Sequence, residues 1–197
     1  AADDSLEVVI YPAAQLGDYT TVQELVSVGD VEMQMATLSS TVDKFLGITS
    51  APYICSTWDE AKAIFNRDIE FTKNISEHLA KQNIKLLSVY PLYFGGVILN
   101  KKPADPANLN YNEGIKIRCQ TMKAEGYYSS YRDVAKYYLP YNDHFEVWYL
   151  YINMDLWNKM TPSQQNALQT AANKLEDDRW AVAPEETKTY EQKLVDY

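Results

Sequence analysis

Stretches with strand patterning alternate with stretches of helical patterning in the first half of the chain, and this order constrains the fold more than any single motif. Residues 6–11 are rich in β-branched side chains and stop at Pro12, which indicates a strand. Apolar residues at helical spacing follow between Asp18 and Gly29, and residues 31–35 then alternate apolar and polar side chains as a second strand would. Strands separated by helices are typical of α/β proteins, so we predict this fold class.

Capping residues mark where the helices of this order begin and end. Asp18 or Thr20 is placed to cap the first helix, and Gly29 can close it in a left-handed conformation. Residues 57–60, Thr-Trp-Asp-Glu, have the spacing of a capping box and predict one long helix that continues toward Leu79. This part of the chain is therefore predicted to be a β-α-β unit followed by a long helix.

The second half of the chain predicts further strands and a long C-terminal helix. Residues 161–164, Thr-Pro-Ser-Gln, combine a cap, a proline at the first helical position and a complete capping box. We expect this helix to reach about Val182, where Pro184 interrupts it, and an exposed helix to follow over residues 185–197. The other predicted elements are strands at 83–89, 95–100 and 145–153, a helix at 131–138, and a short helix around Trp157 with Asp155 as its cap.

The six residues from Gly114 to Cys119 predict a short strand with one apolar and one polar face. Ile115 and Ile117 would point to the core, and Lys116 and Arg118 to the other side. A guanidinium is planar and permanently charged, and it can donate two parallel hydrogen bonds to a carboxylate or sulfonate. Arg118 is therefore a candidate anion clamp. A solvated strand face without a specific role is the alternative that the hexapeptide leaves open.

The charge balance and the hydropathy pattern exclude some classes of partner. Acidic residues outnumber basic ones by 27 to 18, which gives a net charge of -9 and disfavours a nucleic-acid partner. No apolar run approaches the length of a bilayer, and residues 1–5 have neither the basic nor the apolar region of a signal peptide. We therefore expect a soluble chain that binds neither nucleic acid nor a membrane interior.

Motifs of enzymatic and metal chemistry are missing from the sequence. It contains no phosphate-binding glycine loop, no Gly-x-Ser-x-Gly elbow and no His-Glu-x-x-His. With only His78 and His144 present, a histidine-rich metal site is excluded; we interpret His78 as a surface residue and His144 as structural. Asp133 and Glu146 could be imagined as an acid/base pair, but nothing in their spacing selects them. We predict no catalytic residue, no metal and no cofactor.

The cysteines and tyrosines leave alternatives open. Cys55 and Cys119 are compatible with one disulfide or with two buried thiols, and they do not fix the compartment. Tyrosine occurs 16 times, with a concentration between Tyr127 and Tyr151. Such rings serve cores and ligand-lining surfaces equally well, so this count does not locate a site.

Several segments of the chain carry a resemblance to a known family. Residues 10–18 read Ile-Tyr-Pro-Ala-Ala-Gln-Leu-Gly-Asp, with Glu-Leu-Val-Ser-Val-Gly at 24–29, and residues 114–118 read Gly-Ile-Lys-Ile-Arg. The remaining matching segments are residues 131–138, 152–157, 161–165 and 171–172. In this order they resemble the solute-binding proteins of tripartite ATP-independent periplasmic (TRAP) transporters, the DctP-like family.

The chain also departs from the pattern of that family. Its members usually carry a strand and a helix ahead of the segment at Ile10, and a few dozen residues between the positions of Arg118 and Gly126. Here seven residues separate Arg118 from Gly126. Relative to the family pattern, the chain lacks the N-terminal strand and helix and a central segment near residues 119–126.

The resemblance implies an α/β, two-lobed periplasmic-binding-protein fold of type II-like form, with crossing strands and a long C-terminal helix. We expect residues 1–92 to form lobe 1, with the β-α-β core and the long helix. Residues 93–155 are expected to form lobe 2 and the crossing strands. Residues 156–197 are expected to form a C-terminal helical region that spans both lobes.

The resemblance also implies the function and the site. The chain is expected to be a periplasmic, monomeric solute-binding subunit, not an enzyme, which delivers its ligand to the small and large membrane subunits of a TRAP transporter. Arg118 would clamp a small organic acid, meaning a carboxylate, dicarboxylate, oxoacid or sulfonate, while the lobes close around it by hinge motion. Further ligand-binding candidates, each of which could equally serve packing, are Gln34, Tyr93, Phe94, Glu125, Tyr127, Tyr128 and Trp148.

Two rival functions come from other classes of protein. The same fold could serve a sensor that passes ligand occupancy to a receptor kinase, or a metal-independent enzyme that uses carboxylates such as Asp133 and Glu146. Neighbouring genes for two membrane subunits would favour transport, and a neighbouring kinase gene would favour sensing. Product formation from an organic acid would favour the enzyme.

Overall fold

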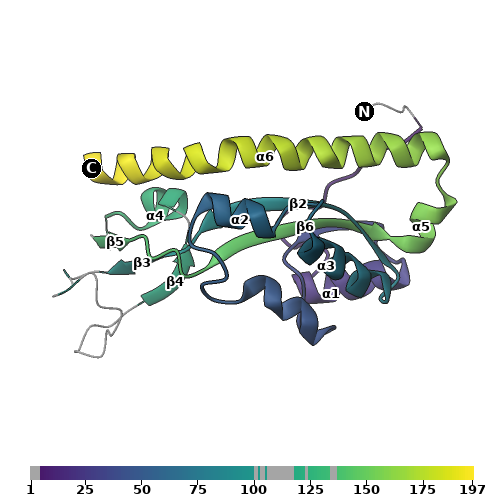
Figure 1. The fold of residues 1–197 in the computed structure, drawn as a ribbon, viewed down its shortest axis with the longest axis horizontal. Helices are drawn as coiled ribbons and strands as arrows, with labels where there is room; N and C mark the ends of the chain where they lie inside the picture. Colours follow the sequence, from purple (N-terminus) through teal and green to yellow (C-terminus); the bar gives the residue numbers. More distant parts are fainter. Residues whose placement is uncertain (1–4, 100–101, 103–104, 106–117, 123, 134–136) are drawn as a thin grey trace.

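The fold of the computed structural model consists of two three-stranded antiparallel sheets and a long C-terminal helix (Figure 1). The structure describes residues 5–99, 102, 105, 118–122, 124–133 and 137–197, with the backbone alone for residues 118–122. The first sheet has the strand order β1 (Met33–Ala36), β6 (Phe145–Asn153), β2 (Ile84–Phe94). The second has the order β4 (Arg118–Met122), β3 (Gly96–Leu99), β5 (Tyr137–Leu139). The predicted α/β class is confirmed.

Helix α6 (Pro162–Asp196) runs along the whole molecule and connects its two ends (Figure 1). Its N-terminal half lies beside β2, and its C-terminal half passes α4 (Ala124–Ser130) above the second sheet. The first sheet therefore lies beside the N-terminal half of α6, and the second sheet lies near the C-terminal end of α6. The elements around the first sheet are α1 (Tyr19–Val28), the 3-10 helix η1 (Lys44–Ser50), α2 (Trp58–Ile64), α3 (Glu70–Ala80) and α5 (Met154–Lys159).

Alternating burial along β6 separates the main core from the opposite face of the first sheet. Phe145, Val147 and Tyr149 are buried, whereas Glu146 and Trp148 are half-buried. A strand places successive side chains on opposite faces, so the buried set faces one side and the half-buried set the other. The buried set joins the main core together with apolar residues of α1, α2 and α3. The predicted strand at 145–153 is confirmed.

The predicted helix caps at Asp18, Gly29, Thr57 and Thr161 are confirmed. The carboxylate of Asp18 accepts the backbone N–H of Thr21 at 2.9 Å, and Gly29 closes α1 in the left-handed region with φ of 86°. Thr57 and Thr161 each begin a complete capping box, at the start of α2 and α6 respectively. Local side-chain chemistry therefore fixes where these three helices start.

The predicted strand at residues 6–11 is wrong. Val8, Val9 and Ile10 are 68%, 61% and 79% exposed, and this segment joins neither sheet. High β-propensity describes how a side chain fits a pleated, half-buried surface, and it forms no strand without a hydrogen-bonded neighbour. The β-α-β core is therefore also wrong, because β1 pairs antiparallel with β6 and with no other described strand.

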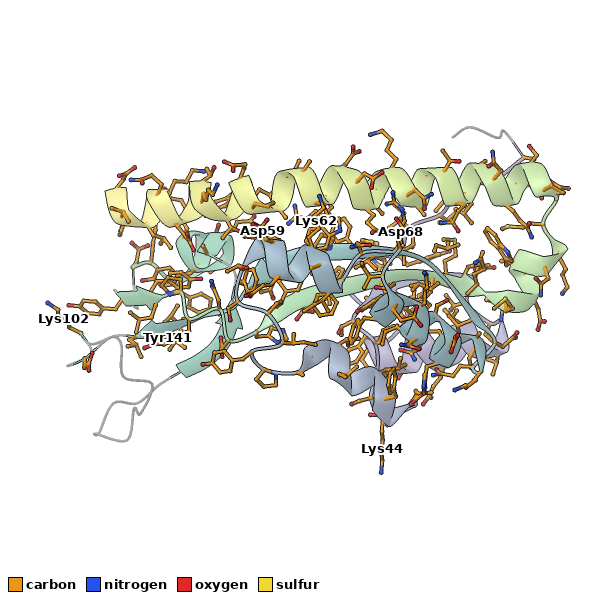
Figure 2. The ribbon with its side chains drawn as sticks, in the orientation of Figure 1. Lys44, Asp59, Lys62, Asp68, Lys102 and Tyr141 are labelled. Atoms are coloured by element: carbon orange, nitrogen blue, oxygen red, sulfur yellow. The ribbon has the colours of Figure 1, made fainter. Side chains whose placement is uncertain are left out.

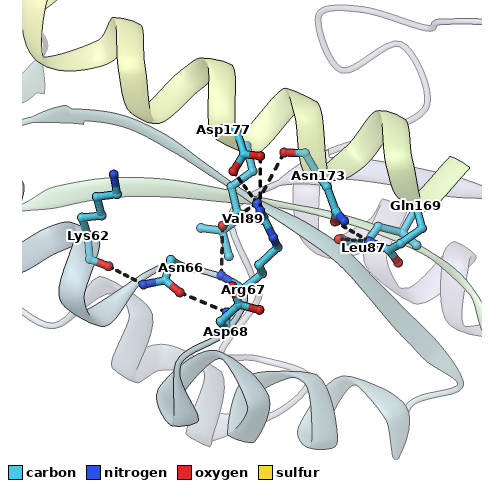
Figure 3. A network of polar contacts seen from close by, with 10 residues as sticks. Lys62, Asn66, Arg67, Asp68, Leu87, Val89, Gln169, Asn173 and Asp177 are labelled. Atoms are coloured by element: carbon cyan, nitrogen blue, oxygen red, sulfur yellow. Dashed lines mark hydrogen bonds and ion pairs between the residues drawn. The ribbon is translucent and has the colours of Figure 1, made fainter.

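The predicted long helix from residue 57 toward Leu79 is two helices, α2 and α3, separated by a break at residues 65–69. Figure 3 shows the contacts at this break. The Asn66 side-chain oxygen accepts the N–H of Asp68 at 3.0 Å, and the N–H of Arg67 donates to the carboxylate of Glu176 at 2.9 Å. These bonds give the backbone partners outside a helix, which the helical periodicity alone could not indicate.

Two predictions between β4 and α6 need correction. The helix predicted at 131–138 lies instead at Ala124–Ser130, and Tyr137–Leu139 is a strand; residues 134–136 lie outside the described residues. The cap of α5 is Asn153, whose side-chain oxygen accepts the N–H of Leu156 at 2.9 Å, rather than Asp155.

Pro184 does not interrupt the C-terminal helix, which is continuous over 35 residues. A proline inside a helix removes one backbone hydrogen bond, so neighbouring contacts must hold the turns on either side. Trp180 and Ala183 before it are buried, and Leu194 after it packs against Ile98 and Tyr127. Apart from such contacts, residues 185–197 are largely exposed, as predicted.

Two further findings concern expectations drawn from composition. No helix in the described part of the chain is both long and apolar enough to cross a membrane. Cys55 is a buried free thiol, and burial raises its pKa to about 11.

Candidate functional site

The candidate site lies where the chain passes between the two sheets. Gly95 connects β2 to β3, and residues 140–144 connect β5 to β6. The N–H of Gly95 donates to the carbonyl of His144 at 2.7 Å, and the N–H of Asn142 donates to the carbonyl of Gly95 at 3.1 Å. The two connections therefore lie side by side and form one junction between the sheets.

Four side chains form a polar group at this junction, which we call the junction cluster: Tyr93, His144, Glu146 and Trp148. The Glu146 carboxylate contacts Nε2 of His144 at 2.7 Å and accepts the indole N–H of Trp148 at 3.0 Å. Tyr93 stands directly opposite Glu146 in the ladder between β2 and β6. Burial, with a smaller effect of the Glu146 charge, raises the pKa of Tyr93 to about 12. The phenol is therefore neutral and available as a hydrogen-bond donor.

A small hollow beside the junction brings Tyr93 together with Glu125 of α4. Its volume is about 10 Å³, close to the minimum that one water molecule needs. An organic acid of several heavy atoms does not fit this hollow. Its remaining lining residues are Leu92, Ala124, Arg179, Glu186, Thr187 and Tyr190.

The predicted clamp, Arg118, is the first residue of β4. In the ladder with β3 it stands opposite Ile98, so its backbone belongs to the sheet that follows the junction. Residues 114–117 of the predicted motif lie outside the described residues, and so does the Arg118 side chain. The direction of the guanidinium stays a prediction.

Three other predicted residues make well-defined contacts away from the hollow. Gln34 lies on β1, at the far side of the first sheet, where its side-chain oxygen accepts the Tyr151 hydroxyl at 2.5 Å. Phe94 is 4% exposed and packs against Phe145 with ring centroids 4.8 Å apart. Tyr127 is 3% exposed and belongs to the small core of the second sheet. Packing accounts for the positions of Phe94 and Tyr127.

Tyr128 belongs to a cluster of rings and cations near the C-terminal end of α6. The Arg132 guanidinium lies 4.3 Å from the centre of its ring, and the Tyr190 ring lies 6.2 Å away. The Lys193 ammonium of α6 lies 5.8 Å from the centre of the same Tyr128 ring, and this cation–π contact joins α6 to α4. Of the eight predicted residues, the structure thus brings Tyr93, Glu125 and Trp148 to the junction.

Sequence reasoning missed two features of the site. It interpreted His144 and Glu146 separately as structural or solvated residues, and their i, i+2 spacing, with His144 directly before β6 and Glu146 within it, was the available signal that they share a face. It did not single out Arg179, which sits inside α6 and donates to backbone carbonyls of β2. No local pattern marks an arginine whose partners are backbone groups 87 and 88 positions away.

The other titratable residues considered from the sequence have partners elsewhere. His78 was predicted to be a surface residue, but its side chain is 25% exposed, contacts the Asp43 carboxylate at 2.6 Å and stacks on Phe45. Asp133 accepts a hydrogen bond from the hydroxyl of Tyr197. Within the described residues, no group of His, Cys, Asp and Glu side chains could hold a metal ion.

A larger hollow of about 260 Å³ lies at the opposite end of the first sheet, between α1 and α5. Its lining residues are Val28, Gly29, Glu32, Asn153, Asp155, Leu156 and Lys159. None of the eight predicted ligand-binding residues belongs to it.

Comparisons with known proteins identify the fold and the family. Among solved structures, the chain is similar to a TRAP periplasmic solute-binding protein from Ochrobactrum anthropi, with a TM-score of 0.79, 17% identity and coverage of 94% of this chain and 69% of that chain. An apo, open structure from Citrobacter koseri gives a TM-score of 0.77 and 17% identity, with 98% and 78% coverage. A protein from Haemophilus influenzae with bound L-gulonate gives 0.71 and 21%, with 95% and 72% coverage.

Two comparisons used the sequence alone, and one of them gave a match. A comparison with curated protein sequences finds no significant match. The family model described as bacterial extracellular solute-binding protein, family 7 (DctP), matches residues 2–126. Because this match spans more than half of the chain and the similar structures are two-lobed TRAP solute-binding proteins, the chain belongs to family 7 of the bacterial extracellular solute-binding proteins, the periplasmic receptors of TRAP transporters.

Proposed function

We propose that the chain captures a small organic acid by an arginine clamp and hinge closure, and delivers it to the membrane subunits of a TRAP transporter. The observation that carries the proposal is the junction, where paired connections at Gly95 and His144 join the sheets beside a polar and aromatic cluster. A hinge built from a few residues between two packed units lets the lobes close on a ligand without unfolding either.

The ligand class follows from the proteins that share the fold. Four of the similar structures were determined with L-gulonate, D-glucuronate, sn-glycerol-3-phosphate or pyroglutamic acid, respectively. Each of these carries one anionic group and several hydrogen-bonding groups. A net charge of -9 makes a general anion-attracting surface unfavourable, so recognition of an acid needs a local positive group. This supports a small organic acid as the ligand.

Arg118 is the positive group that we assign to the ligand's anionic end. Its strand β4 pairs with β3, which directly follows the junction, while Tyr93 and Trp148 stand on the first sheet beside the same junction. A ligand held by Arg118 at one end and by these side chains at the other would bridge the two sheets. A charge-assisted hydrogen bond contributes about 1.5 to 3 kcal/mol, enough to favour closure strongly.

The other candidates take lesser roles in this proposal. Trp148 and Tyr93 would contact the uncharged part of the ligand. Phe94 and Tyr127 would support the ligand-binding side chains indirectly, by packing in the cores of the two sheets. Gln34, Glu125 and Tyr128 are retained as ligand contacts of the closed form. We place the lobe boundaries at 92/93 and 155/156, so the first falls in β2 just before Gly95.

Delivery to the membrane completes the proposed cycle. The closed, monomeric form would dock on the small and large membrane subunits and release the acid there. The family comprises solute-binding proteins of transporters, which are not enzymes, so binding without turnover is the activity to measure.

The test is a thermal-shift and calorimetric screen of the full-length protein against organic acids. L-gulonate, D-glucuronate, glycerol 3-phosphate and pyroglutamate should be compared with uncharged analogues such as glucose. We expect one acid to raise the melting temperature and its neutral analogue not to. Arg118→Ala should weaken the binding of that acid by about 10- to 150-fold, which corresponds to the loss of about 1.5 to 3 kcal/mol from a charge-assisted hydrogen bond.

A matched control removes a positive charge far from the junction. Lys44 on η1 projects from the body of the protein into solvent (Figure 2), and Lys44→Ala should leave the affinity unchanged. An acid that binds wild type and Arg118→Ala equally well would remove Arg118 from its role. Absence of binding to every acid would contradict the proposed ligand class.

A further inference from the structure

The strand β2 contains a bulge just before the junction. In the ladder with β6, Pro91 pairs with Val147, and the next pair is Tyr93 with Glu146. Leu92 is therefore an extra residue without a partner on β6. A bulge of this kind shifts the register of everything after it by one residue.

This shift decides which way Tyr93 faces. Without the extra residue, Tyr93 would stand opposite Phe145, on the face that is packed into the main core. With it, Tyr93 stands opposite Glu146, and Phe94 takes the position opposite Phe145, where it is 4% exposed. The bulge thus places a phenol in the junction cluster and a phenyl ring in the core.

Arg179 of α6 supplies the hydrogen bonds that the bulge needs. Its Nε donates to the carbonyl of Pro91 at 2.8 Å, and one terminal nitrogen donates to the carbonyl of Leu92 at 3.0 Å. The other terminal nitrogen contacts the Glu186 carboxylate at 2.5 Å, and the side chain is only 13% exposed. A planar guanidinium can serve all three acceptors in one fixed geometry, which the point charge of a lysine cannot.

At the first bulge of β2, too, a side chain of α6 donates a hydrogen bond to a backbone carbonyl of the strand. The register also shifts between Leu86 and Ser88, and the Gln169 amide donates to the carbonyl of Leu87 at 2.8 Å. Side chains of α6 therefore bind both irregular points of β2.

We propose that Arg179 is a positioning residue for ligand recognition: by holding the carbonyls of Pro91 and Leu92 it fixes the bulge that turns Tyr93 toward Glu146 at the junction. The role of Tyr93 toward a ligand rests on the proposed function. The effect of Arg179 on the position of Tyr93 does not, and it can be measured in the unliganded protein.

The test places 3-fluorotyrosine at position 93 alone and records its ¹⁹F NMR signal in the full-length protein. We expect Arg179→Ala to move or split the signal, because the bulge loses its donors and the ring samples both registers. Arg179→Gln, which keeps one donor, should give a smaller change in the same direction. Arg67→Ala also removes a contact between α6 and the rest of the protein and should leave the signal in place.

The second readout is affinity for whichever acid wild type binds. Arg179→Ala should weaken it at least about tenfold, and Arg67→Ala should not. An unchanged ¹⁹F signal in folded Arg179→Ala overturns the inference; if that variant does not fold, an unchanged signal in Arg179→Gln does so. A changed signal in a protein that binds no acid would support the role of Arg179 in the bulge and contradict only the proposed function.

Discussion

The Glu176 carboxylate in the middle of α6 accepts the backbone N–H of Val89 in β2 at 3.1 Å, although the Glu176 side chain is only 1% exposed. Its other oxygen accepts the N–H of Arg67 at 2.9 Å, and the Arg67 guanidinium pairs with Asp177 (Figure 3). One buried carboxylate therefore ties the break between α2 and α3, the strand β2 and the helix α6 together. Hydrogen bonds compensate part of the cost of burying this charge.

Glu176→Gln should change how the stability of the protein depends on pH. Burial raises the pKa of Glu176 above its ordinary value of 4.5, so the folded protein binds this proton more tightly than the unfolded chain does. Its contribution is thus greatest below pH 4.5 and is lost as pH rises through the folded-state pKa. We expect the free energy of unfolding of wild type, relative to Glu176→Gln, to fall as the pH rises above 4.5 through the folded-state pKa.

Urea unfolding at several pH values measures this difference. Asp178→Asn changes an exposed carboxylate on the same helix and should give a curve that runs parallel to wild type. Parallel curves for wild type and Glu176→Gln would show that Glu176 titrates alike in the folded and unfolded states.

Much of the fold could be predicted from the sequence because local chemistry determines it. The caps at Asp18, Thr57 and Thr161 were correct, since a hydroxyl or carboxylate next to free backbone N–H groups acts within one turn. The failures share another cause. The strand at residues 6–11 has the right propensity but no partner, and the break at Arg67 depends on Glu176, which is 109 positions away.

The candidate site was less predictable than the fold. Trp148 and Tyr93 were named only through the resemblance to the family, Trp148 on a strand facing the cleft and Tyr93 at the crossing into the second lobe. The bulge that turns Tyr93 toward Glu146 is fixed by Arg179, and a two-residue period read along β2 would not reveal it. The orientation of a side chain that depends on such distant contacts can be determined only from the three-dimensional structure.

Asn153→Ala should destabilise the protein by about 1–3 kcal/mol, because it removes a helix cap and one donor to the buried carbonyl of Val26, which then keeps the N–H of Gly29 as a donor. The Asn153 side chain accepts the N–H of Leu156 at 2.9 Å and donates to the carbonyl of Val26 at 2.8 Å. Asp155→Ala is the matched control, since Asp155 is exposed and does not cap α5; it should cost about 0.5 kcal/mol or less. Equal losses in urea unfolding would contradict the assignment of Asn153 as the cap.

Gly96→Ala should destabilise the second sheet through a steric clash. A Cβ atom at Gly96 would lie 2.5 Å from the Tyr138 ring, closer than such contacts ever come. Tyr138 stacks on Tyr127 at 5.4 Å between ring centroids, so it cannot move without loss of packing, and we expect a cost of about 1–3 kcal/mol. In a double-mutant cycle, Tyr138→Ala should remove most of the effect of Gly96→Ala; strict additivity would rule out the clash.

Asp43→Asn should lower the free energy of unfolding at neutral pH but not at strongly acidic pH. The pKa of Asp43 is lowered from 3.8, chiefly by its hydrogen bond with His78 and also by the N–H of Phe45. A carboxyl with a lowered pKa stabilises the folded state above pH 3.8, and this contribution is lost as pH falls through the folded-state pKa.

Asparagine can still cap η1, so the substitution isolates the charge from the cap. We therefore expect the difference in unfolding free energy between wild type and Asp43→Asn to be present at pH 6 and to vanish as the pH falls through the folded-state pKa of Asp43. A difference that stays constant over this range would mean that the charge of Asp43 contributes nothing and that His78 serves packing alone.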